Sequence, residues 1–336
     1  MADYNTPEFT RYADVHKELK GAGDARPTAL QIVKDNDLEG KLTDKTILIT
    51  GCSSGLGIET ARVLKATGAR LFLTVRDLSK GHNALDEILE PGKVDMLLLD
   101  LNSLASVRKC AAEFLETSGN KLNVLVTNAG IMAKPEDKTA DGFESQFGTN
   151  HLAHFLLFQL VKPALLSSST PAFQSRVVSL SSMAHRSIPP KMDNLMLTGE
   201  YDPIHAYAHS KTANIWFANE IERRYGNQGL HALSVHPGVI LTAIMDHSEV
   251  EKYMVHEPFR NYMKSVEQGA ATTLWAAIGK VWEGTGGKYL EDCQVSKPLK
   301  EGGGDLDAGY AEWAYDPENE AKLWKLSNEW VGFVEK

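Results

Sequence analysis

Residues 46–61 of this chain of 336 residues read TILITGCSSGLGIETA. The stretch begins with an apolar, β-branched run typical of a buried strand, continues with Gly51, Gly55 and Gly57, and ends with apolar residues at helical spacing. Glycine has no Cβ, so backbone N–H groups in such a turn can approach a diphosphate closely. The N-terminus of the following helix adds partial positive charge. We therefore expect the turn to bind a nucleotide.

The spacing of the turn leaves a plainer alternative open. The residues expected to contact the nucleotide are Gly51, Ser53, Ser54, Gly55, Leu56 and Gly57. Their spacing, Gly-x-x-x-Gly-x-Gly, matches neither the G-x-G-x-x-G fingerprint nor the G-x-x-x-x-G-K-[ST] phosphate loop. In a chain with 27 glycines an ordinary turn also fits, so the nucleotide interpretation depends on further motifs.

Composition excludes several classes of function. The net charge of −9 argues against nucleic acid or an anionic membrane as the main partner, since both attract basic surfaces. The three cysteines form no C-x-x-C pair, which suits a reducing compartment and offers no metal framework. The N-terminus lacks the blocks of a signal peptide, and no apolar run approaches membrane-spanning length. We expect a cytoplasmic protein without a membrane span.

Apolar runs alternate with helix-length segments along most of the chain. The runs lie at 71–75, 94–99, 122–127, 176–180 and 230–236. This alternation predicts an α/β fold of the Rossmann type, a doubly wound parallel sheet with helices on both faces. We divide the chain into a loosely attached N-terminal arm (1–42), a nucleotide-binding and catalytic domain (43–300) and a C-terminal helical tail (301–336) packed on that domain.

The end of the second predicted strand bears on the choice of cofactor. Arg76 favours NADP, because an arginine there can meet the 2′-phosphate. Asp77 keeps NAD open, because a carboxylate about twenty residues past a glycine turn can bind the ribose hydroxyls. Asp77 can equally cap the next helix.

Two further groups follow predicted strands. Asp100 and Leu101 follow the third strand, and Asn128, Ala129 and Gly130 follow the fourth. Ligands bind at the carboxyl ends of strands in open α/β sheets, so these residues are candidates for the adenine and the nucleotide cleft. Turns or helix caps explain either group equally well.

Tyr207 and Lys211 form a Tyr-x-x-x-Lys pair on a predicted helix. Residues four apart lie on one helix face, so the phenol and the ammonium are expected to be neighbours. A positive charge beside a phenol lowers its pKa from about 10, which suits proton exchange with a substrate hydroxyl. The spacing alone also arises by chance, so its weight comes from other motifs.

Those motifs follow one another along the chain in a characteristic order. They are TGxxxGxG (50–57), NAG (128–130), Asn150, Ser182, YxxxK (207–211) and PG (237–238). With them the chain resembles the short-chain dehydrogenase/reductase family over about residues 44–290. The resemblance implies an alcohol dehydrogenase or carbonyl reductase. Together with Arg76 it leads us to expect NADP(H) as the cofactor, with NAD(H) less favoured.

The resemblance also implies roles for single residues. Tyr207 would be the acid/base, and Lys211 would lower its pKa and bind the nicotinamide ribose. Ser182, rather than its neighbour Ser181, would steady the substrate oxygen. Asn150 would hold a water in a proton relay. Contacts to the nicotinamide are implied for Pro237, Gly238, Val239 and Thr242.

Two departures from the family pattern are visible. Thr127 precedes the NAG element where an asparagine is commoner. The segment 183–206 is about a dozen residues longer than the minimal family spacing, a feature of the retinol-dehydrogenase-like branch, which the sequence TVRDLSKG also resembles. The arm and the tail fall outside the resemblance.

Other functions were weighed against these motifs. The histidines form no H-E-x-x-H or cysteine-paired set, so we expect no metal, and without a G-x-S-x-G elbow a Ser-His-Asp hydrolase is disfavoured. A nucleotide-sugar epimerase or dehydratase would more often carry G-x-x-G-x-x-G. A catalytically silent, nucleotide-binding regulatory protein of the same fold stays open as the alternative to an enzyme.

Two segments beside the expected nicotinamide site predict the kind of substrate. They are the insertion 183–206 and the stretch 240–263, whose apolar residues are Ile244, Met245, Tyr253, Met254, Val255, Phe259, Tyr262 and Met263. In proteins that share one chemistry, the loops over the cofactor cleft determine which substrate is accepted. Methionine-rich surfaces accept bulky apolar molecules, although such residues also often only cover a hydrophobic core. We expect a lipophilic alcohol, ketone or aldehyde.

The resemblance leaves a homodimer or a homotetramer open.

Overall fold

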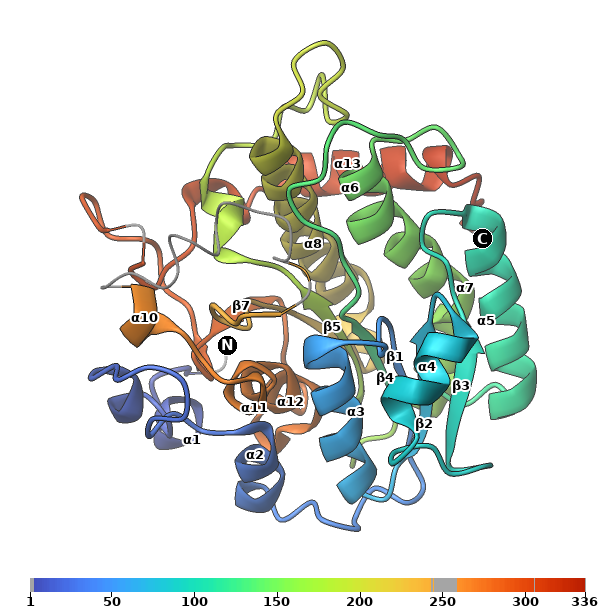
Figure 1. Ribbon diagram of the computed structural model, residues 1–336, viewed down its shortest axis with the longest axis vertical. Coiled ribbons are helices and arrows are strands. Elements are labelled where there is room, and N and C mark those ends of the chain that lie inside the picture. The colour runs from blue at the N-terminus through green and yellow to red at the C-terminus, as the bar shows by residue number, and fades with distance from the viewer. Residues whose placement is uncertain (1–2, 243, 245–258, 305, 336) are drawn as a thin grey trace.

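The computed structural model describes residues 3–242, 244, 259–304 and 306–335. Its centre is an eight-stranded sheet in the order β3-β2-β1-β4-β5-β6-β7-β8 (Figure 1). The strands are β1 (Thr46–Ile49), β2 (Arg70–Val75), β3 (Val94–Leu98), β4 (Val124–Thr127), β5 (Ser175–Leu180), β6 (Leu230–Val235), β7 (Lys288–Glu291) and β8 (Gln294–Val295). From β1 at the centre the chain adds strands toward one edge as far as β3, and then returns to add β4 to β8 toward the other edge. This order confirms the predicted doubly wound α/β fold.

The sheet is parallel except at one edge. Every pair up to β6 and β7 is parallel, and β8 pairs antiparallel with β7. The sequence did not predict this edge, because Gln294–Val295 is a strand of two residues and carries no periodic signal.

Helices cover both faces of the sheet. They are α1 (Pro7–Thr10), α2 (Ala29–Asp35), α3 (Gly55–Ala66), α4 (Leu78–Leu85), α5 (Leu104–Ser118), α6 (Ser145–Phe147), α7 (Ala153–Ser168), α8 (Pro203–Tyr225), α10 (Phe259–Tyr262), α11 (Val266–Gly269), α12 (Ala271–Ile278) and α13 (Pro317–Trp330). Ile47 and Ile49 of β1 pack with α2, α3 and α12, whereas Leu48 packs with α5, α7 and α8. Burial on both faces explains why the parallel strands read as continuous apolar runs.

Several helices begin at side-chain caps. Ser103 accepts a hydrogen bond from the backbone N–H three residues on, at 3.4 Å, and Asp316 does the same at 3.1 Å. Asp77 caps α4 in this way at 3.0 Å. Gly68 follows α3 with a φ of +80°, a conformation that residues with a side chain rarely adopt. Local sequence chemistry therefore fixes where these helices start and stop.

The N-terminal segment differs from the loosely attached arm that the sequence predicted. Ile32 and Val33 of α2 are fully buried. Phe9 packs against Trp275 and Trp282, with ring centroids 6.5 and 5.1 Å apart. Figure 1 shows α1 and α2, in blue, beside the orange helices α10, α11 and α12. Burial of these apolar groups attaches the arm, while the domain boundaries at 42/43 and 300/301 stay predictions.

The C-terminal helix α13 lies against α8. Trp324 is buried among aromatic rings, and its centroid is 4.9 Å from that of Phe155 and 6.1 Å from that of Phe158. Its indole N–H donates to Glu335 at 3.0 Å. Among the residues that the structure describes, none of the helices has the length and apolar character needed to cross a bilayer.

Trp324→Ala is expected to lower the free energy of unfolding by about 3–5 kcal/mol, because it leaves a large cavity in an aromatic cluster. Urea denaturation measures this loss. The matched control is Lys322→Ala, at an exposed position on the same helix, which should change stability by less than about 0.5 kcal/mol. A similarly small effect for Trp324→Ala would contradict the packing of α13.

Candidate active site

The glycine-rich turn joins β1 to α3 and has no room for a side chain at Gly51 or Gly57. A Cβ at Gly57 would lie 2.1 Å from the carbonyl oxygen of Gly51, and a Cβ at Gly51 would lie 2.8 Å from Ala129. Gly51 also has a φ of +75°, which only glycine adopts readily. The turn therefore brings the end of β1, the start of α3 and the loop after β4 into direct contact.

The donors at the start of α3 remain available. Ser54 is the N-cap residue, yet its side chain makes no capping hydrogen bond to the helix. The first N–H groups of a helix have no partner within the helix, and the dipole makes this end attractive to anions. Ser53, Ser54, Gly55, Leu56 and Gly57 thus surround a terminus suited to phosphate.

Asn128 and Ala129 bind the same turn. The Asn128 amide donates to the carbonyl oxygens of Thr50 at 2.9 Å and Gly51 at 3.3 Å. The backbone N–H of Ala129 donates to Thr50 Oγ1 at 3.0 Å. Thr127, the departure from the family pattern, donates its hydroxyl to the carbonyl oxygen of Val178 at 3.3 Å. The loop after β4 is therefore fixed to the turn by hydrogen bonds.

Arg76 and Asp77 follow β2 and differ in whether their side chains have a partner. Both residues are exposed. The Asp77 carboxylate is occupied in capping α4, whereas the Arg76 guanidinium makes no hydrogen bond or ion pair with any described residue. Among the described residues, Arg76 is thus an exposed cation without a partner, one residue past the end of β2.

Asp100 and Leu101 form a tight loop after β3. The Asp100 carboxylate accepts from the backbone N–H of Asn102 at 3.0 Å, and its own N–H donates to Ser106 Oγ at 2.9 Å. Leu101 is buried, with 8% of its surface exposed. These bonds account for the turn, while the second carboxylate oxygen of Asp100 makes no hydrogen bond among the described residues.

The Tyr207 phenol, the Lys211 ammonium and the Ser182 hydroxyl meet at the carboxyl end of β5. The Ser182 hydroxyl lies close enough to the Tyr207 phenol to lower the pKa of that phenol. Lys211 Nζ lies 5.4 Å from the centroid of the Tyr207 ring and donates to the carbonyl oxygen of Leu180 at 3.0 Å. Ser181 instead donates to the backbone carbonyl of Lys211 at 2.8 Å and is buried.

The pKa of the phenol shifts opposite to the sequence-based expectation. Burial raises the pKa of Tyr207 to about 12, and the Ser182 hydroxyl only partly offsets this. Burial also lowers the pKa of Lys211 to about 8. The sequence reasoning included the neighbouring charge but not the loss of hydration on burial, which is the larger effect here.

Asn150 links this group to the loop after β4. It lies in a π-helical turn, Gly148–Leu152, and is fully buried. Its amide donates to the carbonyl oxygen of Ile131 and to Ser210 Oγ, both at 2.9 Å, and its Oδ1 accepts from the N–H of Ile131 at 2.9 Å. A Cβ at Gly130 would lie 3.2 Å from Asn150 Oδ1 and 3.5 Å from Lys211 Nζ. Asn150, Gly130 and Lys211 therefore lie together.

A buried hydrogen-bond chain joins Asn150 to the glycine turn. His154 Nδ1 bonds the carbonyl oxygen of Asn150 at 2.9 Å, so that nitrogen carries the proton. His154 Nε2 bonds Thr50 Oγ1 at 2.9 Å. Burial lowers the pKa of His154 to about 4, which keeps the ring neutral. No motif in the sequence marks this histidine as part of the site, although it lies four residues after Asn150.

The segment after β6 completes the arrangement. A Cβ at Gly55 would lie 3.3 Å from the side chain of Thr242, so this threonine lies against the turn. Gly238 has a φ of +102°, and a Cβ there would lie 2.7 Å from the Lys264 side chain. Lys264 donates from its backbone to Val239 at 2.8 Å and from Nζ to Pro237 at 3.4 Å. Sequence reasoning missed Lys264, which carries no motif.

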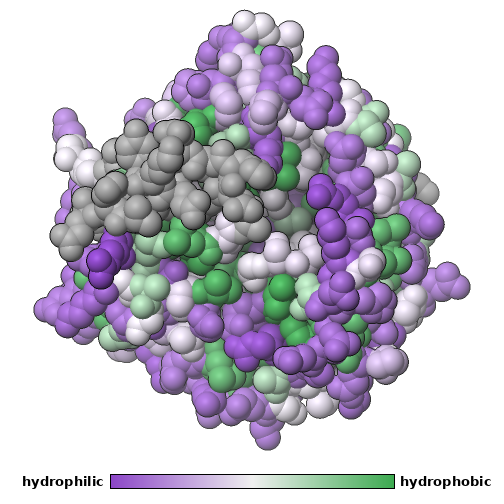
Figure 2. Space-filling model, in the orientation of Figure 1, coloured by the Kyte–Doolittle hydropathy of each residue, from purple (hydrophilic) through white to green (hydrophobic). Residues whose placement is uncertain are grey.

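An apolar cluster adjoins Val239. Its partly buried members are Met132, Met183, Ile244, Tyr262 and Met263. They follow strands β4, β5 and β6, as do Ser182 and Asn128. Figure 2 shows, on the face that it draws, hydrophobic groups near the middle and mainly hydrophilic groups around the rim. Met245, Tyr253, Met254 and Val255, which the sequence analysis also named, lie outside the described residues.

Comparison with known proteins relates this site to one family. Residues 45–252 match the family model described as short chain dehydrogenase. The chain is 55% identical over 320 residues to "Short-chain dehydrogenase/reductase prx1" of Penicillium roqueforti, covering 94% of each chain. It is 40% identical over 257 residues to retinol dehydrogenase 12 of Mus musculus, covering 76% of this chain and 79% of that protein. A solved structure from Mycobacterium paratuberculosis superposes with a TM-score of 0.68 at 32% identity, covering 92% and 98% of the two chains.

Lys211→Met is expected to raise the free energy of unfolding at pH 7 by roughly 2 kcal/mol, because it removes a buried ammonium. Burial lowers the pKa of this lysine from 10.5 to about 8, so between these values the unfolded chain binds more protons than the folded chain. The stability of the wild type should therefore rise with pH across this window, and the advantage of the variant should shrink.

Urea denaturation at about pH 7, 8, 9 and 10 measures this advantage. The control is Lys80→Met, at an exposed position, which should show no such pH-dependent difference. An advantage of Lys211→Met that stays constant across the range would contradict the burial of the charge.

Proposed function

We propose that this chain, which belongs to the short-chain dehydrogenase family, is an NADP(H)-dependent oxidoreductase that interconverts a lipophilic alcohol and its ketone or aldehyde. Membership of the family makes it an oxidoreductase. The observation that carries the finer proposal is the meeting of Tyr207, Ser182 and Lys211 at the carboxyl end of β5. A scaffold without catalysis has no physical need for a buried lysine beside a buried phenol.

The residues present fit a nicotinamide dinucleotide phosphate. The uncapped start of α3 offers N–H donors for the diphosphate. Arg76 is exposed and unpaired among described residues, as an arginine reserved for a 2′-phosphate would be. The engagement of Asp77 with the start of α4 disfavours its use on the ribose of NAD. These features support NADP(H) over NAD(H).

The nicotinamide, when bound, exchanges a hydride with the carbon of the substrate. Tyr207, whose pKa is raised to about 12 by burial, stays protonated near neutral pH and can donate its proton to the substrate oxygen in reduction. Ser182, whose hydroxyl lies beside the phenol and lowers its pKa, would hold the same oxygen. Lys211 stabilises the phenolate left after transfer, and Asn150 fixes the loop at Ile131 beside them.

The apolar cluster around Val239 supports a lipophilic substrate. Met132, Met183 and Met263 bring three flexible, polarizable side chains to one place, and such surfaces adapt to bulky apolar molecules. The cluster draws on segments that follow the strands carrying the proposed catalytic group. The class of substrate proposed is a medium to large apolar alcohol, ketone or aldehyde.

Tyr207→Phe is expected to lower kcat by about a hundredfold or more while leaving the Kd for NADP(H) nearly unchanged, because it removes only the proton donor. Steady-state kinetics and fluorescence titration of the cofactor measure the two quantities. Near-normal turnover would remove Tyr207 from its role. Cofactor binding without any turnover in the wild type would favour a catalytically silent regulatory protein.

Arg76→Ala is expected to weaken NADP(H) binding by roughly 1.5–3 kcal/mol and leave NAD(H) binding unchanged, because only the former has a 2′-phosphate. Calorimetric titration with each cofactor tests this. Arg62→Ala is the matched control, since Arg62 is half exposed and already pairs with Glu59 of the same helix, α3. This substitution should affect the binding of neither cofactor. Equal losses for both cofactors in Arg76→Ala would make Arg76 structural.

The ratio kcat/KM is expected to rise with the apolar size of the ketone across a homologous series, at about 25 cal/mol per Å² of buried surface. Met183→Ala and Met263→Ala should flatten this trend. Leu98→Ala, at a leucine 40% exposed on β3, should leave it intact. Preference for small charged substrates in wild type and variants alike would refute the lipophilic assignment.

A further inference from the structure

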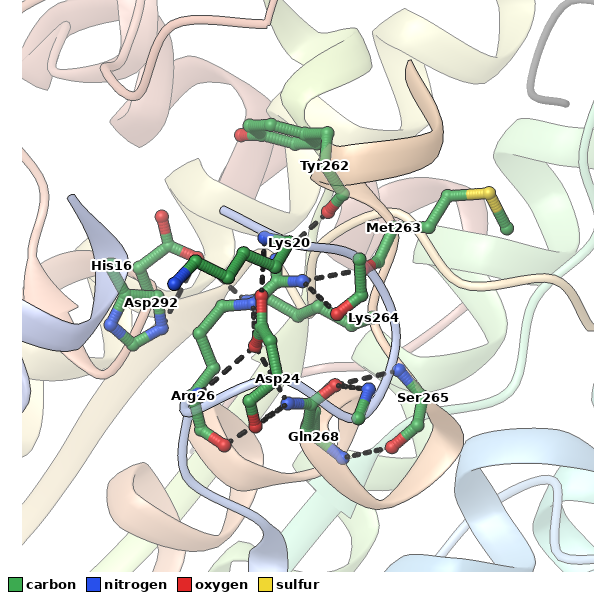
Figure 3. A network of polar contacts seen from close by, with 12 residues as sticks. His16, Lys20, Asp24, Arg26, Tyr262, Met263, Lys264, Ser265, Gln268 and Asp292 are labelled. Carbon is green, nitrogen blue, oxygen red and sulfur yellow. Dashed lines mark hydrogen bonds and ion pairs between the residues drawn. The ribbon is translucent and has the colours of Figure 1, made fainter. Parts of the chain in front are cut away.

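Part of the N-terminal arm lies against the segment that follows the PG motif (Figure 3). Its centre is Arg26, whose side chain is 2% exposed and paired with Asp24 at 2.8 Å. Burying a guanidinium is costly unless its donors are satisfied. We call Gly21, Gly23, Asp24 and Arg26 the N-terminal clamp. These residues precede the segment 45–252 that matches the family model.

The clamp donates hydrogen bonds to three consecutive carbonyl oxygens at the end of α10. The backbone N–H of Gly21 donates to Asn261 at 3.0 Å. Arg26 donates from Nη1 to Tyr262 at 2.9 Å and from Nη2 to Met263 at 2.6 Å. The last carbonyls of a helix lack partners within the helix, and a planar guanidinium can satisfy two at once. Arg26 therefore fixes the direction in which the chain leaves α10.

Gln268 ties the same arm to α11. Its side-chain amide donates to the carbonyl oxygens of Asp24 and Arg26, both at 3.1 Å. Its Oε1 accepts from the N–H of Gly23 at 2.9 Å and from that of Ser265 at 3.0 Å. The segment from α10 to α11 is thus held by the arm at both ends.

Lys264 connects the clamped segment to the PG motif. Its backbone N–H donates to Val239 at 2.8 Å. Its ammonium pairs with Asp292 at 2.7 Å and donates to Pro237 at 3.4 Å. His16 of the arm lies 3.8 Å from the same aspartate. Displacement of the segment would therefore move Tyr262 and Met263 relative to Val239.

We infer that Arg26 is a positioning residue for substrate recognition, because it holds Tyr262 and Met263 in the apolar cluster beside Val239. The inference rests on the proposed function of that cluster. Arg26 itself touches backbone carbonyls and the carboxylate of Asp24, and so acts through the segment it holds. The arm is then a determinant of specificity for bulky apolar substrates.

The test is Arg26→Gln, with Arg11→Gln as the matched control. Arg11 lies in the same arm, is 50% exposed and pairs with Asp35 of α2. In Arg26→Gln, the KM for a bulky apolar ketone should rise about fivefold or more, while kcat, the KM for a small ketone and the Kd for NADP(H) change less than about twofold. Arg11→Gln should match the wild type.

Equal losses for both ketones would reduce Arg26 to a structural role, and an unchanged KM for the bulky ketone would overturn the inference. If Arg26→Gln does not fold, Arg26→Lys replaces it. Lysine keeps the charge but can reach only one of the two carbonyls, so a smaller rise in the same KM is expected. No rise in that variant would equally overturn the inference.

A second measurement does not depend on turnover. Hydrogen exchange of the peptide 259–268 should be at least about tenfold faster in Arg26→Gln than in the wild type, and unchanged in Arg11→Gln. Unchanged exchange in Arg26→Gln would show that Arg26 does not hold the segment. If exchange is faster in Arg26→Gln but the wild-type protein reduces no ketone, the proposed function is overturned while the clamp is retained.

Discussion

The buried ammonium of Lys211 is the constraint on which the proposed site depends. It is held by the carbonyl oxygen of Leu180, which also accepts from Asn214 at 2.9 Å, while Ser181 binds the backbone of the lysine. Burial lowers its pKa to about 8, so the charge is maintained at a cost in stability. Hydrogen bonds at the junction of β5 and α8 hold that charge 5.4 Å from the centre of the Tyr207 ring.

Two sides of the molecule meet at this junction. On one side the glycine turn, Asn128 and the chain from Thr50 through His154 to Asn150 form a rigid polar framework suited to the cofactor. On the other side the apolar cluster around Val239 is assembled from loops and held by Lys264. In the proposed function, the chemistry is assigned to residues at strand ends, and the substrate preference is assigned to segments that the arm holds.

The sequence predicted those features that depend on local physics. The strand, turn and helix at 46–61 and the caps at Ser103 and Asp316 follow from short-range patterns, and the structure contains them. The pKa direction of Tyr207 was missed because burial is a tertiary property. The contact of Arg26 with Tyr262 was missed because it spans 236 positions along the chain, and no periodicity reports a partner so distant.

Transfer of deuterium from NADPH labelled at C4 of the nicotinamide bears most directly on the proposed hydride transfer. Wild-type enzyme, an apolar ketone and each of the two C4-labelled stereoisomers are incubated, and the alcohol is examined by mass spectrometry. The proposal predicts one deuterium on the carbinol carbon from one stereoisomer and none from the other. Oxidation of NADPH that leaves the alcohol unlabelled with both stereoisomers would contradict direct hydride transfer in this site.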